Sequence, residues 1–205
     1  MNYKNEKMEY YNNVESKEPR KNIQAFIREI NCKPSKAIEL GCGSGEEAIY
    51  LIKNGWRVLA IDKENVETRI TKKMNEEQLR NFQFHQEEFE NINQLEKVKL
   101  IVANYSLPFC KKDKFSQMWE KIENSIEKSG YFIGNFFGEN DSWKEIRPEI
   151  TILSKREIIE MFSKFNIIKF QETEKEGKTG LGTSKHWHIY NIIAQKKNMK
   201  RLCEI

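Results

Sequence analysis

The chain has 205 residues, and its 35 lysines and arginines exceed its 31 carboxylates by only four charges. These charges alternate along the whole length, whereas a nucleic-acid-binding protein concentrates its basic residues in a patch or a stripe. The length fits one globular domain with a substantial core, and no apolar run reaches the roughly 20 residues that cross a bilayer. Composition therefore argues against a nucleic-acid partner and against a membrane protein.

The four cysteines, at positions 32, 42, 110 and 203, form no C-x-x-C pair and show no metal-ligand spacing. The first nine residues are polar and charged, unlike a secretory signal. We therefore expect free thiols, a cytoplasmic location and no metal site. The oligomeric state is left open by the sequence.

Helical and strand patterns alternate along most of the chain. Helices are predicted around the apolar positions 23–30, and at 45–54, 65–79, 113–128 and, capped by Ser154, at 155–163. Strands are predicted at 36–40, 57–61, 82–85, 99–104, 131–137, 167–170 and 187–194. The segment 174–182, between the last two strands, is expected to be a loop. This order predicts an α/β fold with a doubly wound, mostly parallel sheet that ends in an antiparallel hairpin.

A glycine-rich turn follows the first predicted strand, in the segment Glu39-Leu40-Gly41-Cys42-Gly43-Ser44-Gly45. Its G-x-G-x-G spacing differs from the G-x-G-x-x-G fingerprint of dinucleotide sites, and Glu46 and Glu47 follow it. Two carboxylates there would repel a pyrophosphate, but they would tolerate a cationic sulfonium. The alternative is a glycine-rich turn that binds no ligand.

The second predicted strand ends on Asp62. A carboxylate at this place can accept hydrogen bonds from both hydroxyls of a ribose. The glycine turn and Asp62 together predict a pocket for a nucleoside, and the absence of a G-x-x-x-x-G-K-[ST] motif argues against a P-loop site.

The glycine motif and Asp62 resemble the first motif and the ribose-binding acid of class I S-adenosylmethionine-dependent methyltransferases. The similarity runs from about Tyr11 to about Lys197, and the segments Ala103–Phe109 and Gly134–Gly138 resemble small bacterial methyltransferases of the tellurite-resistance type. The resemblance implies a Rossmann-like seven-stranded sheet with an antiparallel last strand, and S-adenosylmethionine as cofactor. It divides the chain into a lid segment (1–20), a methyltransferase domain (21–197) and a tail (198–205).

In an open parallel sheet, ligands bind beyond the carboxyl ends of the strands. Together with the resemblance, this rule implies that the backbone of Gly41, Cys42 and Gly43 lies along the methionine part of the cofactor. Asp62 would hold the ribose, and Lys63 would flank it.

Further cofactor contacts are implied by resemblance. Glu88 would meet the adenine amino group and Phe89 would offer its backbone N–H to the ring, although a solvated acidic turn is the alternative for Glu88. The segment Asn104–Phe109 would wall the methyl group, with Asn104 and Tyr105 among the cofactor contacts.

The lid segment should cover the cofactor. Tyr11 and Arg20 would face inward, with Arg20 pairing with the methionine carboxylate unless it is a plain surface charge. The segment Met8–Arg20 and the loop Gly177–Gly182 are expected to act as mobile covers.

We expect the groups for chemistry to be His186, Tyr105 and Asp141. His186 and His188 flank Trp187 on one face of the last predicted strand, and His186 would be a general base at the edge of the acceptor pocket. A histidine that merely hydrogen-bonds near the strand end is the alternative. Alignment of an activated sulfonium can itself supply much of the rate.

The favoured function is a methyltransferase that acts on a small molecule, because the sequence shows only short loops and no appended domain. Two alternatives remain. One is a methyltransferase that acts on protein or nucleic acid, which would need a continuous basic face around the pocket. The other is a protein that binds S-adenosylmethionine without transferring its methyl group.

Overall fold

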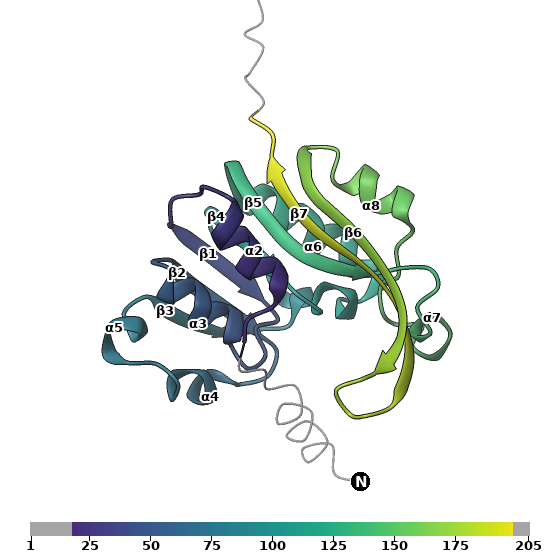
Figure 1. The fold of residues 1–205 in the computed structure, drawn as a ribbon, viewed down its shortest axis with the longest axis horizontal. Helices are drawn as coiled ribbons and strands as arrows, with labels where there is room; N and C mark the ends of the chain where they lie inside the picture. The colour runs from purple at the N-terminus through teal and green to yellow at the C-terminus, as the bar shows by residue number, and fades with distance from the viewer. Residues whose placement is uncertain (1–17, 199–205) are drawn as a thin grey trace, which may run out of the picture.

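The computed structural model describes residues 18–198, and its strands form one seven-stranded sheet (Figure 1). The strands are β1 Lys36–Leu40, β2 Arg57–Asp62, β3 Phe82–Gln86, β4 Val98–Ala103, β5 Ile126–Phe137, β6 Phe165–Lys178 and β7 Ser184–Lys196. Their order in the sheet is β3-β2-β1-β4-β5-β7-β6. The strand β7 runs antiparallel to both of its neighbours, β5 and β6, and the other paired strands are parallel to each other. The predicted Rossmann-like sheet with an antiparallel last strand is confirmed.

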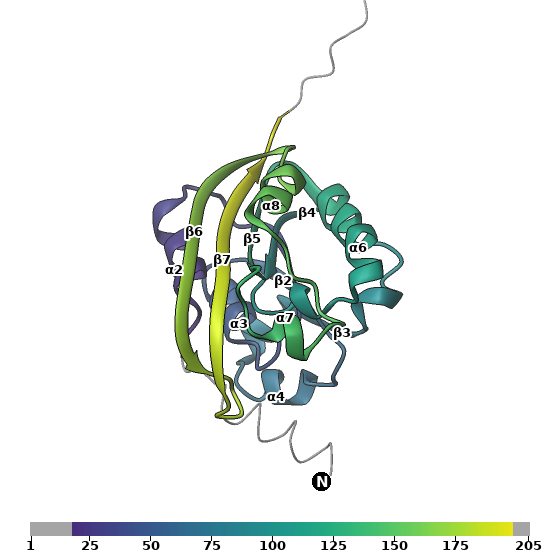
Figure 2. The same cartoon turned by 90° about the vertical axis from the view of Figure 1, so that its right-hand side faces the viewer.

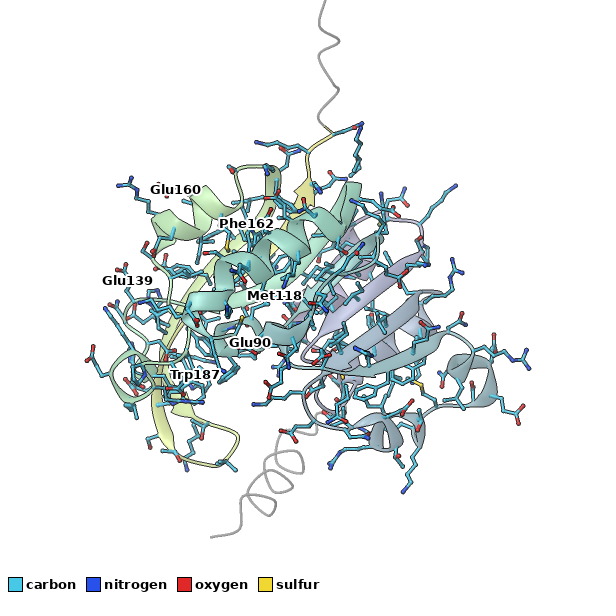
Figure 3. All side chains as sticks on the ribbon, turned by 180° about the vertical axis from the view of Figure 1, so that it is seen from behind. Glu90, Met118, Glu139, Glu160, Phe162 and Trp187 are labelled. Carbon is cyan, nitrogen blue, oxygen red and sulfur yellow. The ribbon has the colours of Figure 1, made fainter. Side chains whose placement is uncertain are left out.

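Helices cover both faces of this sheet. They are α2 Lys21–Glu29, α3 Glu46–Lys53, α4 Glu67–Thr71, α5 Glu76–Leu79, α6 Lys112–Ser125, α7 Trp143–Ile146 and α8 Lys155–Met161. In Figure 1, α2 and α3 lie on the near face of the sheet, and the view from behind in Figure 3 brings α6 to the front. Figure 2 shows β6 and β7 as a long curved hairpin on the side of the molecule opposite α6.

Each face of the sheet has its own hydrophobic core. On the α6 face, the ring centroid of Trp119 lies 5.2 Å from that of Phe132 and 4.8 Å from that of Phe162. On the other face, Phe26 of α2 contacts Trp56 and Tyr131, at 6.0 and 5.2 Å between ring centroids. Because both faces are covered, β1 and β4 are almost wholly buried, as the apolar sequences of these strands require.

The single helix predicted at 65–79 is wrong, because the structure divides it into α4 and α5. Asn75 begins the second helix: its side chain accepts a hydrogen bond from the backbone N–H of Gln78, whose side chain accepts one from the backbone N–H of Asn75. An asparagine that can cap a helix competes with the continuous helix that charge patterning suggested.

Two other boundaries differ from those predicted. The helix α6 ends at Ser125, and β5 begins at Ile126 rather than at Tyr131. Ser129 adopts a φ of 57° beside a register shift in the pairing of β4 with β5. The Ser129-Gly130 pair therefore forms an irregularity within the strand and does not end a helix.

The loop predicted at 174–182 is also wrong, since β6 continues through Lys178 and only 179–183 turn the chain. This part of β6 is polar on its outer face, where Glu174 pairs with His188 and Glu176 with His186 in the strand register. Cross-strand polar pairs stabilise a strand that has no apolar alternation. The hairpin thus projects beyond the carboxyl edge of the sheet (Figure 1).

Candidate active site

The glycine turn after β1 is held against the end of β2. The backbone N–H groups of Gly41 and Cys42 donate to the carbonyl of Ile61, at 2.7 and 3.2 Å. Gly41 has a φ of +70°, and a Cβ at this position would lie 2.3 Å from the Cβ of Ser106. Only glycine fits here, because the backbone is left-handed and the loop after β4 approaches too closely for a side chain.

Asp62 ties this turn to the next strand end. One oxygen of its carboxylate accepts the N–H of Gly43 at 2.9 Å, and the other accepts the N–H of Glu64 at 3.0 Å. Burial raises the pKa of Asp62, and these two backbone N–H groups oppose that shift. Each oxygen keeps a further lone pair for a ligand. Asp62 lines a cleft at the carboxyl edge of the sheet, together with Lys63.

The cleft has a volume of about 1450 Å³ and runs from the ends of β1, β2 and β3 to the β6–β7 hairpin. At the first end it is lined by Gly41, Gly43, Asp62, Lys63, Glu88 and Phe89. At the hairpin end it is lined by Phe109, Phe137, Trp143, Arg147, Leu181 and Trp187. In Figure 3, Trp187 lies among the side chains gathered beside the hairpin. Arg20, Tyr105 and Ser106 also line this cleft.

Tyr105 is held in an unusual conformation. It has a φ of 51°, and its backbone N–H donates to the side-chain oxygen of the fully buried Asn135 at 2.7 Å. A left-handed tyrosine is strained, and such strain is found at functional sites more often than elsewhere. Burial raises the pKa of the Tyr105 hydroxyl, so the phenol stays protonated near neutral pH.

Arg20 stands over Tyr105 beside a buried acid. The guanidinium carbon lies 4.3 Å from the centre of the Tyr105 ring, and Nε lies 3.4 Å from Oε1 of Glu47. The Arg20 side chain is half exposed, which leaves its remaining N–H groups accessible to an anion.

Two buried polar atoms lie near the glycine turn without a hydrogen-bond partner among the described residues. They are Oε2 of Glu39, at the end of β1, and Oγ of Ser106, against Gly41. Burial, and next the charge of Glu47, raise the pKa of Glu39 well above its usual range. Unpaired buried polar atoms are costly, and a bound polar ligand would relieve that cost.

Four of the expected site residues are not among the residues that line the cleft. The Cys42 side chain is buried in the core on the α3 face, and burial raises its thiol pKa well above the usual range. Asn104 is paired with Asn22: its side-chain oxygen accepts the Asn22 amide N–H at 2.6 Å, and its own amide donates to the Asn22 side-chain oxygen at 3.2 Å. Asp141 is buried against Lys185, with its carboxylate oxygen bonded to the ammonium. The fourth expected site residue that does not line the cleft is His186. A further expected site residue, Tyr11, lies outside the described residues.

His186 faces the outer side of the hairpin. Its ring nitrogens lie 2.6 Å from Glu176 and 3.0 Å from Glu174. Alternation along β7 therefore brings Lys185 and Trp187 to the cleft side, and His186 and His188 to the other. The alternation is visible in the sequence, but we expected His186 at the edge of the pocket, whereas Trp187 lines the cleft. Arg147, which lies directly after α7, was missed because no periodic signal marks residues of short loops.

The two carboxylates raise the pKa of His186 in the folded protein. The stability that the protonated histidine contributes is therefore fully present below its usual pKa of about 6.5. This contribution is lost as the pH rises through the higher pKa of the folded state. We expect the difference in melting temperature between wild type and His186→Gln to shrink as pH rises through that window. Thermal unfolding of both proteins across pH 5–9 measures it. A difference that is constant or grows with pH would contradict the pairing.

No group of three or more His, Cys, Asp or Glu side chains within residues 18–198 has the arrangement of a metal site. No helix of that range combines the length and apolar character required to cross a membrane. Neither observation bears on the residues beyond it.

Solved structures with a similar fold include methyltransferases. N-methyltransferase NodS from Bradyrhizobium japonicum, in complex with S-adenosylhomocysteine, has a TM-score of 0.67 at 11% identity over 95% of this chain and 97% of that chain. The 1,6-didemethyltoxoflavin-N1-methyltransferase of Burkholderia thailandensis has a TM-score of 0.60 at 15% identity over 81% of this chain and 72% of that chain. That structure holds 1,6-didemethyltoxoflavin and S-adenosylhomocysteine.

Fold and family together define the class of this protein as an S-adenosylmethionine-dependent methyltransferase, with S-adenosylmethionine as cofactor. TehB from Haemophilus influenzae has a TM-score of 0.75 at 16% identity over 94% of this chain and 67% of that chain. The family model described as tellurite resistance protein TehB matches residues 6–179, and the chain belongs to this family. A search of curated proteins found no match.

Proposed function

We propose that this protein transfers the methyl group of S-adenosylmethionine to a small-molecule acceptor that enters the cleft beside the β6–β7 hairpin. The observation that carries the proposal is the division of one cleft into two chemically different ends. The end at β1–β3 offers a glycine turn and carboxylates, and the hairpin end offers aromatic rings.

The residues at the first end fit the cofactor. Asp62 would accept hydrogen bonds from the ribose hydroxyls, with Lys63 beside it. Glu88 would accept one from the adenine amino group, while the N–H of Phe89 faces the ring. The bare backbone of Gly41 and Gly43 leaves room for the methionine chain.

The charged end of the methionine would meet a further group of residues. The exposed N–H groups of Arg20 suit its carboxylate. The unpartnered oxygen atoms of Glu39 and Ser106 suit its ammonium, directly or through water. The cost of these two buried unpaired atoms, which a bound cofactor would relieve, supports this placement.

Tyr105 stands between the two ends, where we propose that it borders the transferred methyl group. When bound, the cofactor supplies an activated methyl: the acceptor's lone pair forms the new bond to carbon while the carbon–sulfur bond breaks and its electron pair stays on sulfur. The location of His186 and Asp141 away from the cleft lining supports a transfer that depends on alignment without a general base.

The residues that line the hairpin end of the cleft support a small acceptor. Rings from the loop after β4, from β5, α7 and β7 enclose it, in keeping with the concave, mostly apolar sites of small ligands. A methyltransferase of the same fold holds 1,6-didemethyltoxoflavin, itself a small molecule.

The proposal is tested with methyl-labelled S-adenosylmethionine and a cell extract separated into metabolite, protein and nucleic-acid fractions. We expect label to enter the metabolite fraction alone. Label in protein or nucleic acid would favour a macromolecular acceptor. Calorimetric binding of S-adenosylhomocysteine with no labelled product in any fraction would favour a protein that binds the cofactor without transferring its methyl group.

Cofactor choice is tested separately. S-adenosylmethionine and S-adenosylhomocysteine should bind much more tightly than NAD or ATP in calorimetry, because Glu46 and Glu47 occupy the first turn of α3 where a pyrophosphate would need an uncharged N-terminus. Tighter binding of NAD or ATP would overturn the assignment.

A further inference from the structure

A third apolar cluster lies apart from the two cores that cover the sheet. Its buried members are Phe137, Ile150 and Ile189, and partly buried aromatic side chains pack against them. Four of its rings line the hairpin end of the cleft, and we call them the aromatic wall: Phe109, Phe137, Trp143 and Trp187. Three of the four stay partly exposed, although large rings in a core are normally covered.

The rings of the aromatic wall hold one another in place. The centroids of Trp143 and Trp187 are 5.6 Å apart with an interplanar angle of 56°, and Trp143 lies 5.6 Å from Phe137 in an edge-on arrangement. Phe109 packs edge-on against both Phe137 and Trp143, at 6.0 and 5.7 Å. Such mutual packing makes a firm surface before any ligand arrives.

A buried ion pair supports this surface from beneath. Lys185, whose side chain is 1% exposed, places its ammonium 4.2 Å from the centre of the Trp143 ring and 4.4 Å from that of Trp187. Its partner Asp141 also accepts the backbone N–H of Trp143 at 3.0 Å and that of His188 at 3.3 Å. Asp141 thus joins the start of α7 to β7, which fixes the two tryptophans relative to each other.

Protein cations already occupy positions over the rings. Besides Lys185, the guanidinium of Arg147 lies 5.3 Å from the Phe109 ring centre and 5.1 Å from that of Trp143. A ring quadrupole attracts a cation, so an aromatic pocket often binds ammonium groups. Here the side chains of Lys185 and Arg147 already occupy the positions that attract a cation, so a cationic ligand would be repelled.

The carboxylates near the wall are also paired. Glu149 lies 2.9 Å from Arg147, and Glu176 lies 2.6 Å from His186. Other acids line the cleft at its cofactor end, away from the aromatic wall, among them Glu64, Glu87 and Glu88. Lys175 and Lys178 of the hairpin also line this end of the cleft, so the hairpin end offers flat apolar surface with positive charge beside it.

We propose that the acceptor is a planar aromatic molecule, uncharged or anionic, whose ring lies against the aromatic wall, and that aliphatic ammonium compounds are rejected. This inference rests on the proposed function and names its substrate class. An aromatic ring matches the flat surface of Trp143 and Trp187, and a negative substituent would meet Arg147.

The test measures binding to the protein loaded with S-adenosylhomocysteine, by ligand-detected NMR and competition. The probes are 2-naphthoate, its saturated counterpart decahydro-2-naphthoate, and 2-naphthylmethylammonium. We expect the naphthoate to bind on the order of tenfold more tightly than either of the other two. Equal binding of the saturated acid, or tighter binding of the ammonium compound, would overturn the proposal.

Variants locate the site. Trp143→Leu and Trp187→Leu keep apolar volume but remove the ring, and we expect naphthoate binding to weaken on the order of tenfold, with Trp143→Phe and Trp187→Phe retaining most of it. Ile146→Ala, on the exposed side of α7, is the matched control and should bind as wild type does. Unchanged binding in folded leucine variants would contradict the assignment.

The outcomes separate this inference from the proposed function. Binding of S-adenosylhomocysteine, followed by calorimetry in each variant, reports folding and the cofactor end. If the cofactor binds and label is transferred to metabolites, but the aromatic probes show no preference, only the acceptor class fails. If no label is transferred, the proposed function fails. Because the comparison of probes uses wild-type protein, it stands even where a variant does not fold.

Discussion

Replacing Lys185 by methionine is expected to lower the free energy of unfolding by about 3–5 kcal/mol, the usual effect of leaving one charge of a buried pair alone. Asp141 would remain fully buried, bonded to the backbone N–H groups of Trp143 and His188 but without its counter-ion. Urea unfolding monitored by circular dichroism measures the change.

Two controls make this expectation specific. The double variant Asp141→Leu/Lys185→Met replaces both charges by apolar groups and should recover most of the lost stability. Lys164 pairs with Glu123 at 2.6 Å with a half-exposed lysine side chain, so Lys164→Met should change stability by less than about 1 kcal/mol. If Lys185→Met were no worse than Lys164→Met, the pair beneath the aromatic wall would not be a structural support.

Replacing Asp62 by alanine is expected to weaken binding of S-adenosylhomocysteine by about a hundredfold or more. The carboxylate would accept two ribose hydroxyls, and a hydrogen bond to a charged group contributes about 1.5–3 kcal/mol, so the loss of both exceeds a factor of one hundred. Calorimetric titration of wild type and variant gives the ratio of dissociation constants.

The Asp62 side chain also holds the N–H groups of Gly43 and Glu64, so the variant must be shown to fold by its thermal melting. Glu67→Ala, on the exposed first turn of α4, removes a nearby acid that does not line the cleft and should leave affinity unchanged. An unchanged dissociation constant in folded Asp62→Ala would remove Asp62 from the site.

The contact between the glycine turn and Asp62 could be predicted from the sequence because its signals are local. Gly41 and Asp62 end adjacent strands of a parallel sheet, so a motif and a strand order are enough to bring them together. The turn requires glycine for a positive φ and a close contact, which restricts the residue type and makes the pattern visible.

The hairpin end of the cleft could not be predicted in the same way. Alternation along β7 separates His186 from Trp187, but which of them faces the cleft depends on how β7 pairs between β5 and β6. The polar half of β6 carries no apolar alternation, so it was interpreted as a loop although Glu174 and Glu176 pair across the hairpin. Lys185 and Asp141 are far apart in sequence, and no motif indicates that they form a buried pair.

A crystal structure of the complex with S-adenosylhomocysteine would locate the cofactor directly. We predict that the ribose hydroxyls bond to Asp62, that the adenine lies between Glu88 and Phe89, and that the sulfur faces Tyr105 and the aromatic wall. A nucleoside bound elsewhere, or a sulfur directed away from Trp143 and Trp187, would contradict it.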